Sequence, residues 1–225
     1  RNAKKTPFSL QTTMANLYTE AITLSNQGVA MIEAGNYKNA RATFKKALGL
    51  MKSNVQGSGK RQLGGESSVS FRWSSNTLLP AEKLHAESSA GSSFVFRRSL
   101  LIIPATFHGT HDCYPETAAM LYNLSLSFHF EGQLTNNSTL LEKAMRAYSV
   151  AATIRRRRKG CRKLQSDRLV DIAISNNMAM IHQEFMDFDK ARSCFAKISR
   201  ALRSLGSGSF LDQTEYQGLV LNLMM

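Results

Sequence analysis

Residues 21–50, AITLSNQGVAMIEAGNYKNARATFKKALGL, decide the fold predicted for this chain, because they hold two helical periodicities separated by one break. In the first run, Ala21, Leu24, Gly28 and Met31 recur every three or four residues and therefore share one face of a helix. Gly35-Asn36 then interrupts the pattern. The first half of this stretch is thus predicted to be an amphipathic helix that ends in a turn.

The second run places Ala40, Phe44 and Ala47 on one face of a second helix. Small residues on either side of an aromatic ring let the two helix backbones approach closely, and Phe44 fills the space between them. Residues 21–50 are therefore predicted to form a helical hairpin.

This hairpin resembles the tetratricopeptide repeat, a helix-turn-helix unit of about 34 residues. The residues that carry the resemblance are Leu24 and Gly28 on the first helix, Tyr37 at the turn, and Ala40, Phe44 and Ala47 on the second helix. Leu24 stands where the family often has Trp, and no proline closes the unit.

The pattern recurs twice later in the chain. The second unit carries Leu121, Leu124, Ser125 and Phe128, a break at Glu131-Gly132, a longer predicted turn, and then Ala144, Tyr148 and Ala151. The third carries Ile172, Ser175, Met178, Ala179 and His182, then Phe188, Ala191, Phe195 and Ile198. Asn26, Asn123 and Asn177 each stand two residues before the small residue of a first helix, and we expect them to hydrogen-bond locally between helices.

We therefore predict an all-α protein whose antiparallel hairpins stack as a short right-handed superhelix of the tetratricopeptide type, with a largely disordered insertion. In chain order we expect a basic mobile leader (1–13), a first hairpin (14–52), the insertion (53–115), a second hairpin (116–154), a basic connector (155–168), a third hairpin (169–205) and a C-terminal capping helix (211–225).

The insertion is rich in serine and glycine, a composition that cannot bury enough apolar surface to order itself. Residues Phe94 to Ile103, FVFRRSLLII, are the exception. They are apolar and β-branched enough to form a strand or a segment docked on the helices, and Pro104 ends them.

Composition and charge narrow the function. The formal net charge of +13 predicts attraction to anionic partners such as an acidic protein or nucleic acid. No apolar run is long enough to span a membrane. Three cysteines, an odd number, and the absence of a visible secretory signal favour an intracellular, cytoplasmic location, with the nucleus as an alternative.

The strongest charge cluster is the basic run from Arg155 to Lys163, RRRRKGCRK. Its cations can contact phosphates and release counterions, so a nucleic-acid-associated protein is the alternative function, although no aromatic residue interleaves with the run. The candidate anion-binding residues are Arg155, Arg156, Arg157, Arg158, Lys159, Arg162 and Lys163.

No catalytic constellation is visible: the chain has no phosphate-binding glycine loop, no nucleophile motif and no paired carboxylates in a periodic context. His108, His111, Asp112 and Cys113 offer zinc-ligand chemistry within six residues, but no second ligand pair has a matching spacing, so we expect a polar loop. We predict neither an enzyme nor a bound cofactor or metal.

The resemblance implies a non-catalytic scaffold that binds another protein, as a peptide or a helix, in the concave groove lined by the first helices. Carried over by position, the groove residues are Ser25, Val29, Ile32, Tyr122, Leu126, His129, Asn176, Met180 and Gln183. The Lys and Arg residues with which some members hold a C-terminal carboxylate are absent from these faces, which disfavours that ligand.

Overall fold

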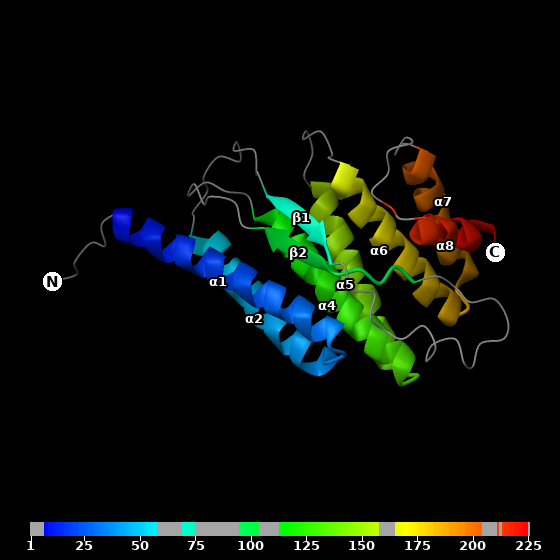
Figure 1. The fold of residues 1–225 in the computed structure, drawn as a ribbon, viewed down its shortest axis with the longest axis horizontal. Helices are drawn as coiled ribbons and strands as arrows, with labels where there is room; N and C mark the ends of the chain where they lie inside the picture. Colours follow the sequence, from blue (N-terminus) through cyan, green and yellow to red (C-terminus); the bar gives the residue numbers. More distant parts are fainter. Residues whose placement is uncertain are drawn as a thin grey trace.

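The computed structural model describes residues 7–57, 69–74, 95–103, 113–157, 165–203, 211 and 213–224. This part of the chain is mostly helical, as predicted. The helices are α1 (Pro7–Glu33), α2 (Tyr37–Gly57), α4 (Tyr114–Leu134), α5 (Ser138–Arg157), α6 (Gln165–Glu184), α7 (Phe188–Arg203) and α8 (Gln213–Met224). Two short strands, β1 (Ser70–Trp73) and β2 (Leu100–Ile103), complete the elements (Figure 1).

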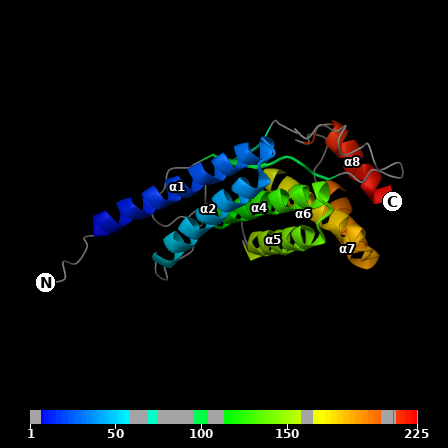
Figure 2. The ribbon, with the colours of Figure 1, turned by 90° about the horizontal axis from the view of Figure 1, so that it is seen from below.

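Six of these helices form three pairs, α1 with α2, α4 with α5, and α6 with α7, which lie side by side in Figure 2. The same turn closes each pair. Gly35, Asn136 and Met186 have φ angles of 73°, 48° and 57°. The next amide in each turn reaches back to a carbonyl of the last helical turn, for example from Asn36 to Met31 at 2.8 Å. This is a Schellman closure, in which a left-handed residue ends the helix.

The prediction of a longer turn in the second unit is wrong. The predicted break at Glu131-Gly132 lies inside α4, which continues to Leu134 before the turn. Gly132 serves packing instead, because a Cβ there would lie 2.8 Å from a methyl carbon of Leu141. A glycine in a helix was thus mistaken for a helix end.

Small and aromatic residues fill the space between paired helices as the periodicity predicted. Ala40, Phe44 and Ala47 are buried, and a Cβ on Gly28 would lie 2.7 Å from the Phe44 ring. The second pair repeats this with Ala144, Tyr148 and Ala151, and the third buries Ala191 and Ile198.

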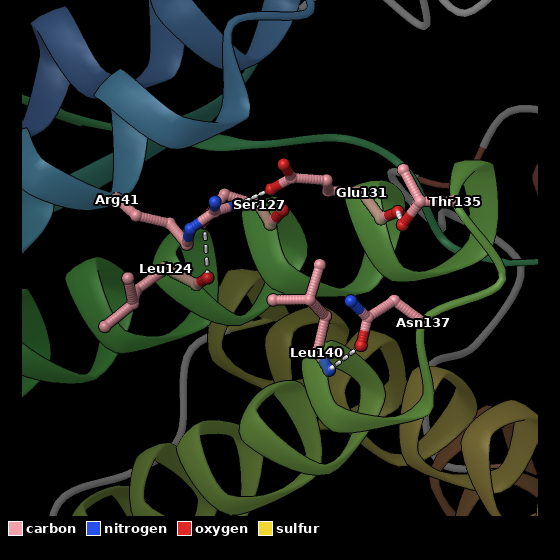
Figure 3. A network of polar contacts seen from close by, with 7 residues as sticks. All are labelled: Arg41, Leu124, Ser127, Glu131, Thr135, Asn137 and Leu140. Carbon is pink, nitrogen blue, oxygen red and sulfur yellow. Dashed lines mark hydrogen bonds and ion pairs between the residues drawn. The ribbon is translucent and has the colours of Figure 1, made fainter.

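The first two pairs join through α4, which contacts α1, α2, α5 and β2, and the second and third pairs join through α5 and α6. Arg41 of α2 forms an ion pair with Glu131 of α4 and donates to the Ser127 carbonyl at 3.3 Å (Figure 3). Its guanidinium carbon lies 5.0 Å from the centre of the Phe128 ring. The first two pairs are therefore held together by a charged side chain packed against an aromatic ring, as well as by apolar contacts.

Several helix ends differ from the predicted boundaries. α1 begins at Pro7, inside the predicted leader, and α2 continues to Gly57. α5 extends to Arg157 and α6 begins at Gln165, so both helices enter the stretch expected to be a connector. Charge alone does not end a helix, because Lys and Arg are good helix formers. Most of the insertion expected to be disordered lies outside the described residues.

No described helix combines the length and the apolar composition needed to cross a bilayer.

We expect Gly28→Ala to lower the free energy of unfolding by about 1–3 kcal/mol, because the new methyl group collides with the buried Phe44 ring. Gly49→Ala is the matched control: no atom lies within 4 Å of its added Cβ, so the better helix propensity should stabilise by up to about 1 kcal/mol. Urea denaturation of both variants measures the difference. Equal effects would contradict the close approach of α1 and α2.

Candidate functional site

Residues 95–103, here called the docked segment, run in extended form across the first helices of the three pairs. Figure 1 shows the β2 end of this segment lying over α4. Side chains of α1, α4 and α6 hydrogen-bond its backbone. Two of these side chains, Asn26 and Asn177, stand 76 and 81 residues away in the sequence from the residues that they bind. The segment thus ties the three pairs together along one face.

Two asparagines hold the end of the docked segment nearest α1. Asn26 accepts from the Ile102 amide at 2.9 Å and donates to the Ile102 carbonyl at 2.9 Å. Asn123 does the same with Leu100, at 2.9 Å and 2.8 Å. Each carboxamide therefore satisfies both backbone groups of one residue, as a neighbouring strand would.

A third asparagine holds the other end. Asn177 accepts from the Phe96 amide at 2.8 Å and donates to the Phe96 carbonyl at 2.9 Å. The Tyr148 hydroxyl lies 3.0 Å from the same amide nitrogen, and Tyr122 donates to the Arg98 carbonyl at 2.9 Å. The helices thus provide partners for every second residue along one edge of the docked segment.

The opposite edge of the docked segment pairs with β1. The two strands are antiparallel, with Arg72 opposite Leu101 and Ser70 opposite Ile103. The Ser74 amide extends this edge by donating to the Ser99 carbonyl at 2.8 Å. The docked segment therefore has β1 along one edge and asparagine side chains along the other, in a two-stranded sheet, so the backbone groups named here have partners.

The expectation that these asparagines bond locally between helices is wrong for Asn26 and Asn123, which bind the docked segment. Asn177 does both, because it also donates to the Tyr148 hydroxyl of α5 at 3.0 Å. Their common position in the three units was the signal that they share a role. The apolar stretch after Phe94 was separately predicted to be a strand or a docked segment, and residues 100–103 of it form β2. Nothing in the sequence linked these two observations.

Apolar side chains anchor the docked segment to the core. Val95, Phe96, Leu100 and Ile102 are buried, whereas Ile103 is 41% exposed. The Trp73 ring of β1 lies edge-on to Phe96, with centroids 5.0 Å apart. The segment is held both by its backbone and by large apolar side chains.

A charged contact links the docked segment to α8. The Arg98 guanidinium lies 3.2 Å from both carboxylate oxygens of Glu215, and it also donates to the Ser74 carbonyl at 3.2 Å. The Glu215 side chain is only 7% exposed. At the other end of α8, Asn222 donates to Asn176 at 2.8 Å. The C-terminal helix thus contacts both the segment and α6.

The predicted groove residues lie on α1, α4 and α6, and all except Gln183 are buried. The buried ones are Ser25, Val29, Ile32, Tyr122, Leu126, His129, Asn176 and Met180. Among the nine predicted groove residues, Tyr122 hydrogen-bonds the docked segment directly, and Asn176 contacts the clamping residue Asn177 at 3.4 Å. The clamping asparagines themselves were not among the predicted groove residues.

His129 is a packing residue in this arrangement. Neither of its ring nitrogens has a hydrogen-bond partner among the described residues, and its ring stacks on Phe130 at 6.5 Å. Burial, with a smaller contribution from the nearby Arg97 charge, lowers the pKa of His129 to about 3. The imidazole is therefore neutral around pH 7.

The structure describes part of the predicted anion-binding run. Arg155 is paired with Asp171 at 2.6 Å, Arg156 is exposed, and Arg157 ends α5. Arg158, Lys159, Arg162 and Lys163 lie outside the described residues, as do His108, His111 and Asp112. Cys113 is buried at the start of α4. An anion-binding role stays a prediction.

A cavity of about 480 Å³ lies between α5, α6 and α7. It is lined by Arg156, Lys197 and Arg200, together with Asp171 and the buried Cys194. The Asp171 charge is balanced by Arg155, so the walls carry an excess of positive charge.

Comparisons with models of protein families, with curated proteins and with solved structures found no match.

We expect Asn123→Ala to destabilise the fold by roughly 2–5 kcal/mol, because the buried amide and carbonyl of Leu100 both lose their partner. Asn26→Ala is the matched comparison at a half-buried clamp, where water can replace the side chain at a cost of about 1 kcal/mol. Urea denaturation measures both changes. Equal losses at the two sites would contradict this role of burial.

His129 should make stability depend on pH. Because its folded pKa is depressed from 6.5 to about 3, its neutral form stabilises the fold above pH 6.5, and this contribution falls as pH drops toward 3. The slope should reach about 1.4 kcal/mol per pH unit. His129→Leu should flatten this part of the unfolding curve, measured by urea denaturation from pH 7 to 4. An unchanged slope would show that the imidazole is not buried.

Proposed function

We propose that this chain is a non-catalytic protein-interaction scaffold of the tetratricopeptide type, whose concave groove along α1, α4 and α6 binds an extended peptide of a partner protein. The observation that carries the proposal is the set of three carboxamides, Asn26, Asn123 and Asn177, each of which holds both backbone groups of one residue. Such contacts recognise a main chain, which every extended peptide offers.

The same contacts favour an extended peptide over a helix. Each carboxamide needs a free N–H and a free C=O on one residue. In an α-helix those groups are engaged in the helix's own hydrogen bonds, except at its ends. The three clamps also engage residues 96, 100 and 102, which are separated by even numbers. Residues separated by an even number of positions present their backbone groups on the same edge of an extended chain.

The docked segment is the occupant of this site in the free chain, and the partner's peptide takes its place. Because the docked segment belongs to the same chain as the groove, it rebinds as an intramolecular ligand. Intramolecular linkage gives an effective concentration of about a millimolar. A partner peptide must therefore be abundant, or must bind more tightly than the docked segment, before it can displace that segment.

The test uses the full chain with its own segment weakened. Leu100→Asp places a charge at a buried position of the docked segment but leaves the helices unaltered. A fluorescently labelled peptide of residues 94–104, FVFRRSLLIIP, should bind this variant in an anisotropy titration and bind the unaltered chain at least tenfold more weakly, because the tethered segment competes. Adding Asn123→Ala to Leu100→Asp should abolish binding.

Ile103→Asp is the matched control, since Ile103 is 41% exposed and its replacement should leave the tethered segment in place. Far-UV circular dichroism establishes that each variant keeps its helices, and Leu100→Ala serves as a milder opening variant. If the helices are intact and the peptide fails to bind both Leu100 variants, the docked segment is a permanent part of the fold and the proposal is rejected.

A further inference from the structure

The contacts of Arg98 describe the kind of peptide that fits the groove. Side chains alternate between the two faces of an extended chain, so the neighbours Arg97 and Arg98 point to opposite sides. Arg98 reaches Glu215 of α8 and lies 6.0 Å over the Trp73 ring. Arg97 forms no ion pair with a carboxylate in the part of the chain that the structure describes. The two arginines are therefore not equivalent.

Glu215 makes the position of Arg98 selective for a cation. Its carboxylate is almost fully buried, with 7% of the side chain exposed, and it faces the guanidinium with both oxygens at 3.2 Å. A buried carboxylate that loses one of its cationic contacts is destabilised, and one that meets a second carboxylate is destabilised further. An occupant with an acidic residue at this position is thus rejected.

Apolar positions flank the cation in a fixed order. Phe96 lies two residues before Arg98, under the Trp73 ring, and Leu100 and Ile102 lie two and four residues after it. All three are buried and are the same residues whose backbones are clamped. Each clamp therefore coincides with a site for a large apolar side chain.

We infer that the groove selects an extended partner segment with an apolar residue, a basic residue two positions later, and apolar residues four and six positions after the first. The basic residue pairs with Glu215, and the docked segment is the chain's own copy of this pattern. The inference rests on the proposed function and adds to it the chemical class of the partner: a segment of another protein that alternates apolar and variable positions around one Arg or Lys.

The test reverses a charge first on the peptide and then on the protein. Three labelled peptides of residues 94–104 are titrated into the full chain carrying Leu100→Asp: the unaltered sequence, Arg98→Glu and Arg97→Glu. Arg98→Glu should bind at least tenfold more weakly, because two carboxylates then meet at Glu215. Arg97→Glu makes the same change in charge at a half-buried position that does not meet Glu215, so it should weaken binding clearly less than Arg98→Glu does.

Adding Glu215→Arg to the same chain should reverse the preference, so that the Arg98→Glu peptide binds more tightly than the unaltered one. Equal binding of all three peptides would overturn the inference while the proposed function stands. Failure of the unaltered peptide to bind a folded variant rejects the proposed function itself. The two failures are therefore distinguishable.

A second, independent test needs neither an added peptide nor the Leu100→Asp substitution. Trp73 is the single tryptophan of the sequence, and its ring packs on Phe96 of the docked segment. Arg98→Glu should release the segment and shift the tryptophan emission to longer wavelength. Combining it with Glu215→Arg should restore the original emission. An unchanged spectrum in Arg98→Glu, or no recovery in the double variant, would overturn the role of this pair.

Discussion

The structure depends on one constraint: an extended segment buried against helices must find partners for the backbone groups along both of its edges. Helix surfaces offer no free backbone groups for this purpose, because their own are already paired. The chain meets the constraint with three carboxamides on one edge and β1 on the other. The positions of α1, α4 and α6 are then coupled, since each must present its asparagine to the same straight chain.

In this arrangement, the groups that hold an extended segment differ from the groups that can distinguish its side chains. A carboxamide bonded to a backbone amide and carbonyl is indifferent to the side chain of that residue, so the clamps alone would hold any extended peptide. Under the proposed function, selection among peptides comes from the groups around the clamps: the Trp73 ring edge-on to Phe96, the buried surroundings of Leu100, and Glu215 on α8. The C-terminal helix, expected only as a cap on the last pair, therefore also contributes a charge to the site.

The periodic sequence was sufficient to predict the helix pairs, their buried small and aromatic faces, and the apolar stretch that docks. It could not predict that the stretch meets Asn26 or Asn177, because contacts across 76 and 81 residues leave no local pattern. β1 was hidden in a serine-rich context, and its strand form depends on pairing with β2. The turn of the second unit was misplaced because Gly132, a packing residue, looks like a helix end in sequence.

Under the proposed function, the burial of the predicted groove residues determines how a partner peptide would replace the docked segment. With the docked segment in place, positions such as Val29, Leu126 and Met180 belong to one continuous core with Leu100 and Ile102. Removing the segment without replacement would expose this apolar surface and leave the carboxamides to water, so an empty groove is the least stable of the possible states. A partner peptide of the proposed kind would therefore gain most by replacing the contacts one clamp at a time, as each part of the docked segment leaves. The even spacing of the clamped residues allows an incoming extended chain to follow that order along the same edge.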